Sequence, residues 1–390
     1  MAIINEMVRM VNNIELFPND INFLNPFFST HLITCLGNKR SLLPFINTGV
    51  ETVKKALRKN KLTIFDGFSG SGVVSRFFKY HSESLWVNDL EDYCEILSKC
   101  YLSNKSEVNT SYIEEKIDWL NTNKLNSRRK KIGFIEKNYA PRNDNKIQPM
   151  ERVFYTNRNA RIIDNLKYLI NSKIDEAKRH FFFAPLIVKA AINVNTSGVF
   201  KGFHKKNKIG CFGGGGEDAL SRIKREITLD SPIFSDVECA VHVYKEDVNR
   251  LVQSSKLPEE VDLAYYDPPY NQHPYGSNYF MLNIIANKQE EIEIQDGVSG
   301  ISRNWNRSSY NKRTKALLAM DDLIRDTKAK YILISYNNEG MIGVEELKVI
   351  LSKYGSYSVM EKGYNTYRGC RNLFKRNIKV KEMLWLLKKR

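Results

Sequence analysis

Two short β-prone runs, joined by a glycine-rich turn and a helical pattern, constrain the fold more than any other part of the chain. The first is Leu62-Thr-Ile-Phe65, which leads directly into Asp66-Gly-Phe-Ser-Gly-Ser-Gly72. Apolar residues at 73, 74, 77 and 78 then have helical spacing, and a second run ends at Asn88-Asp89. A strand, a glycine turn, a helix, a strand and an acidic residue in this order indicate the start of a doubly wound α/β sheet.

The rest of the chain divides into one interruption and a return to strands. Residues ~100 to ~235 are basic, helix-prone and irregular, and β-prone runs resume only after them. We therefore predict that residues 1–99 and 236–390 form two parts of one α/β domain and that residues 100–235 form an inserted, mainly helical domain. Ser41 is expected to cap a helix that begins near Leu42. The later strands are predicted at 240–244, 261–266, 331–335 and 380–387.

Composition excludes several classes of protein. The longest apolar stretch, Phe181 to Val194, is interrupted by Lys189, so a membrane span is not expected. The N-terminus carries Glu6 and Arg9 where a signal peptide needs an apolar core. Six cysteines are scattered without a CxxC pair or zinc-ligand spacing, so we expect no metal and reduced thiols in a cytoplasm.

The net charge indicates a polyanionic partner. The chain has a formal charge of +16, and much of it lies in two regions. Residues 124–179 hold 15 Lys/Arg against 6 Asp/Glu, and residues 362–390 hold 10 against 1, an excess of +9 in each. Such concentration favours a surface that binds a phosphate backbone, although a merely basic enzyme is the alternative.

The most specific motif is Tyr265-Tyr-Asp-Pro-Pro-Tyr270, which closes a predicted strand. Two prolines fix the backbone and remove two donors, which holds the Asp267 carboxylate and the Pro268 carbonyl in a rigid turn. Two adjacent acceptors match one exocyclic amino group, and Tyr270 offers a flat face on which a base can stack. The alternative is a proline-stabilised turn with an ordinary aspartate.

Two weaker signals lie upstream. The glycine turn lets the backbone approach a ligand closely, or is simply a tight connection between strand and helix. Asp89, at the end of the next strand, is placed to bind the hydroxyls of a ribose, or to cap the following helix.

Together these motifs resemble the N6-adenine DNA methyltransferases of the α group, the D12 class, which includes Dam-like and restriction-modification enzymes. The resemblance implies a Rossmann-like, S-adenosylmethionine-dependent methyltransferase sheet with helices on both faces, and an inserted target-recognition domain at 100–235. It also implies that 1–99 and 236–390 are the two parts of the catalytic domain. The expected catalytic residues are Asp267, Pro268, Pro269 and Tyr270, and the expected cofactor residues are Lys39, Asp66, Phe68, Gly70, Gly72, Asp89, Asp247 and Asp267.

The activity implied by this resemblance is methyl transfer from S-adenosylmethionine to N6 of an adenine flipped out of double-stranded DNA. A cognate restriction endonuclease is an expected partner, in the cytoplasm of a prokaryote or of a cell that carries the phage-borne gene. Candidate DNA-binding residues come from the basic run, from a central lysine pair and from the C-terminal basic loop; they are Arg128, Arg129, Lys130, Lys131, Lys205, Lys206, Arg368 and Arg371.

Several alternatives stay open at the level of sequence. N4-cytosine enzymes also methylate an exocyclic amine, but they more often have Ser at the first position of the tetrad that corresponds to Asp267–Tyr270. Asp267 therefore favours adenine. C5-cytosine methylation is disfavoured because no Cys follows a Pro. An RNA substrate and a non-enzymatic nucleic-acid-binding module are further alternatives, and the 128–131 run could be an ordinary solvated loop.

Overall fold

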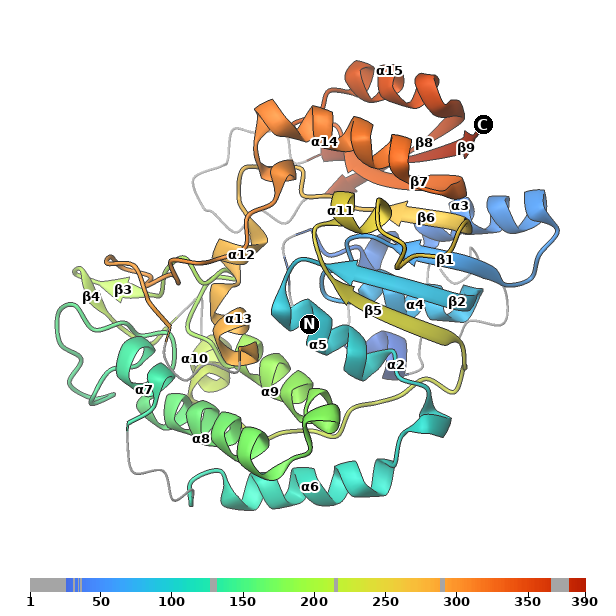
Figure 1. The fold of residues 1–390 in the computed structure, drawn as a ribbon. Coiled ribbons are helices and arrows are strands. Elements are labelled where there is room, and N and C mark those ends of the chain that lie inside the picture. Colours follow the sequence, from blue (N-terminus) through green and yellow to red (C-terminus); the bar gives the residue numbers. More distant parts are fainter. Residues whose placement is uncertain are drawn as a thin grey trace.

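A seven-stranded mixed sheet forms the centre of the catalytic part (Figure 1). The computed structural model describes residues 26–126 except 31, 34 and 36, and residues 132–213, 217–287, 292–365 and 379–390. Five neighbouring strands are parallel, and the last two strands of the sheet run antiparallel to their neighbours. In sheet order the strands are β5 (Ala240–Lys245), β2 (Ser82–Asp89), β1 (Leu62–Asp66), β6 (Val261–Tyr266), β7 (Ala329–Asn337), β9 (Lys379–Lys389) and β8 (Gly355–Asn365).

Alternation along the strands builds a core on each face of this sheet. On β6, Leu263 and Tyr265 pack into one core, whereas Ala264 and Tyr266 pack into the other, and all six strand residues are buried. A strand buried on both faces explains the continuous apolar run in the sequence. The first face is covered by α2 (Pro26–Ser29), α3 (Leu43–Leu57) and α4 (Val73–His81), and the second by α11 (Val248–Val252), α14 (Arg313–Asp326) and α15 (Val344–Tyr354).

The strand order changes direction at the centre of the sheet. From β1 the chain proceeds outward through β2 to β5, and then returns to β6 on the other side of β1. The chain segments that follow β1 and β6 run away from each other, which opens a crevice at the carboxyl ends of these two strands. The residues that end these strands, Asp66 and the Asp267 that follows Tyr266, therefore lie at the same edge.

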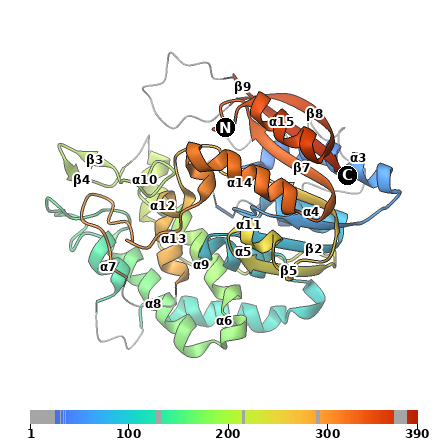
Figure 2. The ribbon, with the colours of Figure 1, turned by 45° about the horizontal axis from the view of Figure 1, so that its top comes forward.

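The residues between ~100 and ~235 are mainly helical and lie beside the sheet rather than within it (Figures 1 and 2). Within the described part of this region, the regular strands form a short hairpin, which Figure 1 shows at the far left. None of the helices in the described part of the chain is long and apolar enough to cross a bilayer. The elements are α6 (Thr110–Asn123), α7 (Phe134–Tyr139), α8 (Asn157–Lys173), α9 (His180–Ile192), β3 (Lys205–Lys206), β4 (Ile209–Gly210) and α10 (Glu217–Lys224).

Two helices connect this region to the sheet. α5 (Asp92–Tyr101) contacts β2 and β5 on one side and α9 on the other. α13 (Phe280–Ala286), which follows α12 (Tyr275–Asn278) shortly after the tetrad, packs against both α5 and α9. One apolar core therefore includes residues from before, within and after the inserted region.

The predicted strands are confirmed in type and place, but one local prediction is wrong and one strand was missed. Ser41 does not cap a helix: it lies inside a 3-10 turn, Arg40–Leu42, and α3 begins after Leu42 without a side-chain cap. The Pro44 ring at the start of α3 removes one of the N–H groups that a cap would have satisfied. The strand β8 was missed, because its sequence is polar and one edge of it is unpaired.

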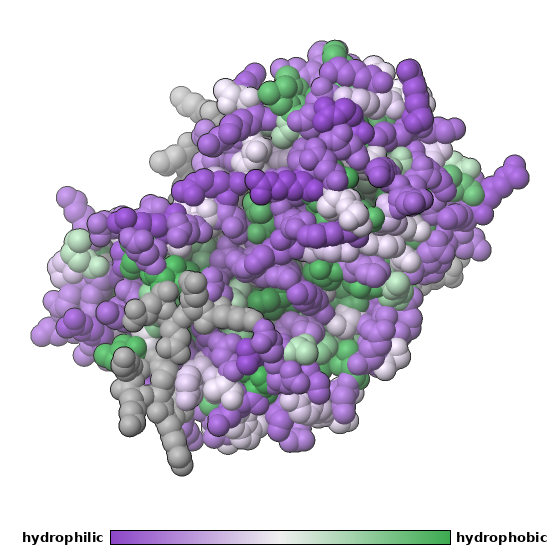
Figure 3. Space-filling view, viewed as in Figure 1, coloured by the Kyte–Doolittle hydropathy of each residue, from purple (hydrophilic) through white to green (hydrophobic). Residues whose placement is uncertain are grey.

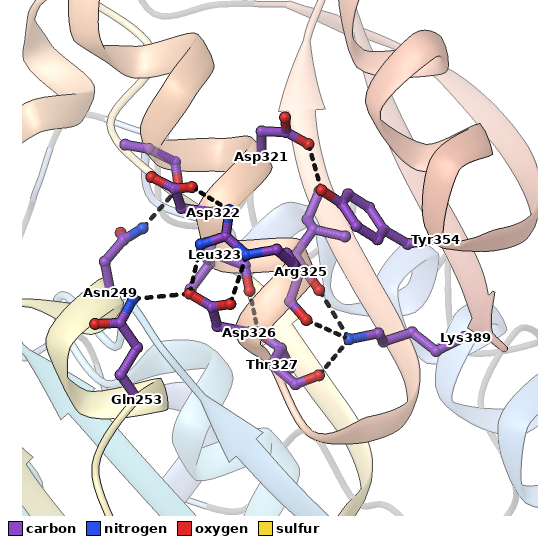
Figure 4. Close-up of polar contacts among 12 residues, drawn as sticks. Asn249, Gln253, Asp321, Asp322, Leu323, Arg325, Asp326, Thr327, Tyr354 and Lys389 are labelled. Carbon is purple, nitrogen blue, oxygen red and sulfur yellow. Dashed lines mark hydrogen bonds and ion pairs between the residues drawn. The ribbon is translucent and has the colours of Figure 1, made fainter.

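A polar network fixes the end of β9 to α14 (Figure 4). The Lys389 ammonium donates to the carbonyls of Ile324 (2.9 Å), Arg325 (2.9 Å) and Thr327 (2.6 Å), which are carbonyls left open at the end of α14. Arg325 in turn bonds to two aspartates of its own helix. The last strand of the sheet is thus held in register by a cation at a helix C-terminus.

Replacement of Lys389 by Met is expected to lower the free energy of unfolding by about 1–2 kcal/mol, because three carbonyls lose a charged donor while the aliphatic stem is kept. Urea denaturation followed by fluorescence measures this change. The exposed neighbour Lys388, changed to Met, is the control and should have little effect. Equal effects of the two substitutions would contradict the capping role of Lys389.

Candidate active site

A pocket opens at the carboxyl edge of the sheet, where the crevice between β1 and β6 is expected. Its walls come from five places in the sequence: the segment before α3, the glycine loop, the end of β2, the tetrad with the residues that follow it, and the segment before α14. Residues that line it include Gly37, Asn38, Lys39, Phe68, Ser69, Gly70, Ser71, Asp89, Leu90, Glu91, Asp267, Pro269, Tyr275, Asn306 and Asn311.

The glycine loop is held by two carboxylates. Asp66 is completely buried beneath the loop, where it accepts from the Ser75 hydroxyl (2.6 Å) and the Phe68 N–H (3.3 Å). Burial raises the pKa of Asp66 to about 7. Asp89 accepts from the Gly70 N–H at 2.8 Å, and Gly70 has a φ of +52°, in the left-handed region that favours glycine. The loop is therefore shaped before a ligand enters.

A second acidic residue, Glu91, lies beside Asp89 and was missed at the level of sequence. Its carboxylate accepts from the side-chain amides of Asn283 and Asn306, and Asn306 also donates to the Leu90 carbonyl at 2.8 Å. Burial raises the pKa of Glu91 to about 7. Asn306, from the segment that precedes α14, thus contributes to the pocket wall.

The tetrad aspartate, Asp267, forms an ion pair with Lys39, which lies in the segment before α3. The Lys39 ammonium lies 3.1 Å from Asp267 Oδ1 and 3.0 Å from Glu382 Oε1, and 5.6 Å from the centre of the Tyr270 ring. The Lys39 and Glu382 side chains are each 5% exposed, whereas Asp267 is 18% exposed at the pocket. Residues 39, 267 and 382 come from three distant parts of the chain, and the fold brings their charges together.

These contacts shift the ionisation of both partners. Burial raises the pKa of Asp267 to about 6, even though the Lys39 charge lowers it. Burial by itself lowers the pKa of Lys39, but the Asp267 and Glu382 carboxylates outweigh this effect and hold it above its ordinary value. At neutral pH the site therefore contains an ionised Asp267 beside a charged Lys39.

The segment before α3 packs directly on the tetrad side of the pocket. Gly37 has a φ of +77°, and a Cβ at this position would lie 3.2 Å from the hydroxyl oxygens of Tyr270 and Tyr275. Tyr275 stacks on Tyr279 with ring centres 5.7 Å apart. The glycine is required because the backbone passes two tyrosine hydroxyls at close range.

The expected site residues fall into two groups. Lys39, Phe68, Gly70, Asp89, Asp267 and Pro269 line the pocket. The remaining expected residues are not among the described residues that line the pocket. Asp66 lies beneath the loop, Gly72 begins α4, and Pro268 is buried. The Tyr270 ring packs edge-on against Tyr336, with centroids 6.4 Å apart.

The Asp247 side chain caps a helix. Its carboxylate accepts from the N–H groups of Asn249 (3.1 Å) and Arg250 (3.3 Å) and so caps α11. Among the residues that the structure describes at the pocket wall, Asp247 is absent. The acidic residue at this strand end has the geometry of a helix cap.

Of the expected DNA-binding residues, two are described. Lys205 and Lys206 form β3 of the exposed hairpin. The hairpin lies a few residues beyond Phe200, whose N–H donates to the Asn278 carbonyl of α12 at 2.7 Å. This bond ties the hairpin region to the helix that follows the tetrad. Arg128, Arg129, Lys130, Lys131, Arg368 and Arg371 lie outside the described residues.

The pocket, the tetrad and the sheet order match a known family. The model of the D12 class N6 adenine-specific DNA methyltransferases matches residues 36–350. The chain belongs to this class. The match begins within the Lys39 motif and includes the glycine loop and the tetrad, so the methyltransferase is adenine-specific and uses S-adenosylmethionine as its methyl donor. The N4-cytosine and non-enzymatic alternatives are thereby set aside.

Several modification enzymes are similar to this methyltransferase. M.NlaIII, a Type II methyltransferase of Neisseria lactamica, is 28% identical over 339 residues, which cover 85% of this chain and 92% of the relative. M.CviAII of Paramecium bursaria Chlorella virus 1 is 26% identical, with coverage of 85% and 92%. The modification methylase StsI of Streptococcus sanguinis is 27% identical over 91% of this chain, which spans 52% of that longer relative.

Changing Asp89 to Asn is expected to weaken S-adenosylmethionine binding roughly 10- to 100-fold, because a charged acceptor that orders the Gly70 loop becomes a neutral amide. Isothermal titration calorimetry measures the Kd. The control is Asp92→Asn, three residues further on, where the carboxylate pairs with Lys245 away from the pocket. A Kd for Asp89→Asn within about twofold of the wild type would contradict the prediction.

Proposed function

We propose that this pocket holds S-adenosylmethionine and that the tetrad receives the target adenine at its edge. The observation that carries the proposal is that Asp267 lines the same pocket as the glycine loop, with the Lys39 ammonium at 3.1 Å. A methyl donor on the loop and an amine on the tetrad would therefore meet in one cavity. Pre-set geometry of this kind lowers the entropic part of the barrier.

The cofactor roles follow from the lining. The Asp89 carboxylate, with Glu91 beside it, would face the ribose hydroxyls, and the glycine loop would face the amino-acid part of the cofactor. Phe68, which packs edge-on against Tyr310 at 5.3 Å, offers an apolar edge for the adenine ring. Asp247 receives no ligand contact in this proposal, because its carboxylate caps α11.

The transfer itself needs acceptors more than it needs a base. The Asp267 carboxylate and the Pro268 carbonyl would each accept a hydrogen bond from one of the two N6–H groups. These hydrogen bonds would turn the nitrogen lone pair out of the ring plane and toward the methyl group. Bound S-adenosylmethionine would supply the methyl group: the N–CH₃ bond would form as the S–CH₃ bond breaks, with S-adenosylhomocysteine as the leaving group. Positive charge develops on N6 and is stabilised by the carboxylate until one N6 proton is lost to Asp267 or water.

The target base must leave the helix first. An adenine within a duplex cannot place N6 against a tetrad in a pocket, so the nucleotide has to be flipped out of the stack. Tyr270 would stack on the flipped base, since its half-buried ring already lies next to the Lys39 ammonium.

The inserted region is the proposed DNA-recognition part. Its exposed lysine hairpin is tied to α12, next to the tetrad, by the bond from Phe200 to Asn278. Hydrophilic side chains dominate the face of the molecule in Figure 3, and apolar ones appear only in small separate areas. Such a surface suits a charged partner. Residues 100–235 would thus form the target-recognition domain, and 1–99 with 236–390 the catalytic domain.

We further propose that the enzyme protects DNA in a restriction-modification system. The modification methylases to which it is similar support this role, and a cognate endonuclease that cuts the same site would be its functional partner. DNA in the cytoplasm of the host cell is the expected location of its substrate.

Asp267→Ala should abolish methyl transfer while S-adenosylmethionine and DNA still bind, because only the charged acceptor for N6 is lost. The measurement is incorporation of labelled methyl groups into DNA, with N6-methyladenine identified by mass spectrometry. The wild-type activity should also fall as the pH is lowered through about 6, because Asp267 is protonated there. Turnover within ~10-fold of the wild type would refute the catalytic role.

The double variant Lys205→Ala/Lys206→Ala should weaken binding to cognate and non-cognate DNA by similar factors. A lysine side chain that is not held in a fixed position binds phosphates without reading bases. The slope of log binding constant against log salt concentration should therefore become shallower by up to about 0.9 for each phosphate that is no longer neutralised. The control pair is Lys348→Ala/Lys353→Ala on α15, which Figure 1 shows on the opposite side of the molecule from the hairpin. An unchanged slope would show that the hairpin does not bind DNA.

A further inference from the structure

One buried charge in the site belongs to none of the motifs that define the family resemblance. Glu382, on β9, has a side chain that is 5% exposed, and its Oε1 accepts from the Lys39 ammonium (3.0 Å) and from the Ser335 hydroxyl (2.7 Å). It is also the single acidic residue between 362 and 390, among ten basic ones. Burying a carboxylate costs desolvation free energy unless its partners compensate, so the presence of one at this position requires an explanation.

We propose that Glu382 is a positioning residue for methyl transfer, which acts through Lys39 to keep the Asp267 site negatively charged when the adenine amine becomes cationic. This inference rests on the proposed roles of Asp267 and Lys39. Glu382 does not line the pocket and touches neither the proposed cofactor site nor the proposed adenine site in the described residues. Its effect is exerted on the charge and place of the lysine.

The net charge of the cluster is the physical basis. Asp267 and Lys39 alone form a neutral pair, in which the ammonium would be satisfied by the same carboxylate that has to stabilise the N6 cation. Glu382 takes one of the three ammonium hydrogens and brings the total charge of the cluster to −1. A cluster of charge −1 complements a developing charge of +1, and electrostatic effects are strong where water is excluded.

The position of Glu382 follows from the sheet. β9 runs antiparallel between β7 and β8, and Glu382 pairs with Asn337 at the carboxyl end of β7. Ser335, two residues earlier on β7, reaches the same carboxylate. The network at Lys389 fixes the other end of β9, so the register that places Glu382 behind Lys39 is held at both ends of the strand.

Protonation of Asp267 gives a readout that a purely structural role would not change. Burial raises the pKa of Asp267, Lys39 lowers it, and Glu382 raises it again. The other titratable groups near Asp267 are Asp66 on β1, Tyr265 on β6 and Tyr275 on α12. Burial raises the pKa of all three. The Glu382 charge also raises the pKa of Tyr265, but a tyrosine whose pKa lies well above its ordinary value stays neutral at acidic pH, so loss of that charge is detected there on Asp267.

The test is Glu382→Gln, which keeps the shape and an acceptor but removes the charge. At pH 8, where Asp267 is ionised in both proteins, the single-turnover rate of methyl transfer should fall roughly 10- to 100-fold, with Kd values for DNA and S-adenosylmethionine within about threefold of the wild type. The acid limb of the pH–rate profile, where the rate falls as Asp267 becomes protonated, should move to lower pH. Lys39→Met should move it to higher pH, because the stabilising cation is lost.

Controls separate this inference from a loss of fold and from the proposed function. Glu361→Gln on β8, in the exposed pair with Lys381, is the matched substitution and should leave both readouts unchanged. Ser335→Ala keeps all charges and should leave the acid limb in place. If Asp267→Ala is inactive but Glu382→Gln keeps the wild-type rate and acid limb, the role of Glu382 is refuted and the proposed function stands. If Asp267→Ala remains active, the proposed function itself fails.

Discussion

The ammonium of Lys39 is the contact on which the site depends. It joins the segment that precedes α3, a turn at the end of the central strand β6, and a strand close to the C-terminus. Without the cation, two carboxylates would be buried together with no charge to compensate them, and desolvation would protonate one of them. Lys39 thus makes it possible for Asp267 to be both buried and ionised, which is what an acceptor for a reacting amine requires.

The sheet explains why such distant residues can meet. β1 and β6 are neighbours although almost two hundred residues separate them, because the helical insertion leaves and returns at one side of the sheet. The glycine loop and the tetrad then leave the same edge, and the α12–α13 segment after the tetrad packs on the insertion. The helices that follow the tetrad thus pack against residues 100–235, the proposed DNA-recognition region. The proposed flipping of a base into the pocket would need such closeness between the region that binds DNA and the tetrad.

The parts of the site that were predictable from sequence are those whose chemistry is local. The glycine loop, Asp89 and the tetrad each occur within a few residues of a strand end, so the strand pattern and the turn residues place them together. Glu382 could not be found in this way, because its partner is 343 positions away and no motif surrounds it. The one signal was its isolation among basic residues. Glu91 and Asn306 were missed for the same reason. The prediction for Asp247 rests on a strand-end pattern that a helix-capping acid and a ligand-binding acid share.

The chain as a whole is positively charged, whereas the buried cluster at the site is negatively charged, and each charge suits a different step of the proposed reaction. Outside, an excess of Lys and Arg gives the chain its +16, which suits a duplex whose phosphates must be held whatever the sequence between them. Inside, the described cluster of Lys39, Asp267 and Glu382 has a net charge of −1. In the proposed mechanism, a strongly positive protein would by itself disfavour a cation on the flipped base. The buried carboxylates of this cluster would offset that effect at the place where the positive charge is proposed to develop.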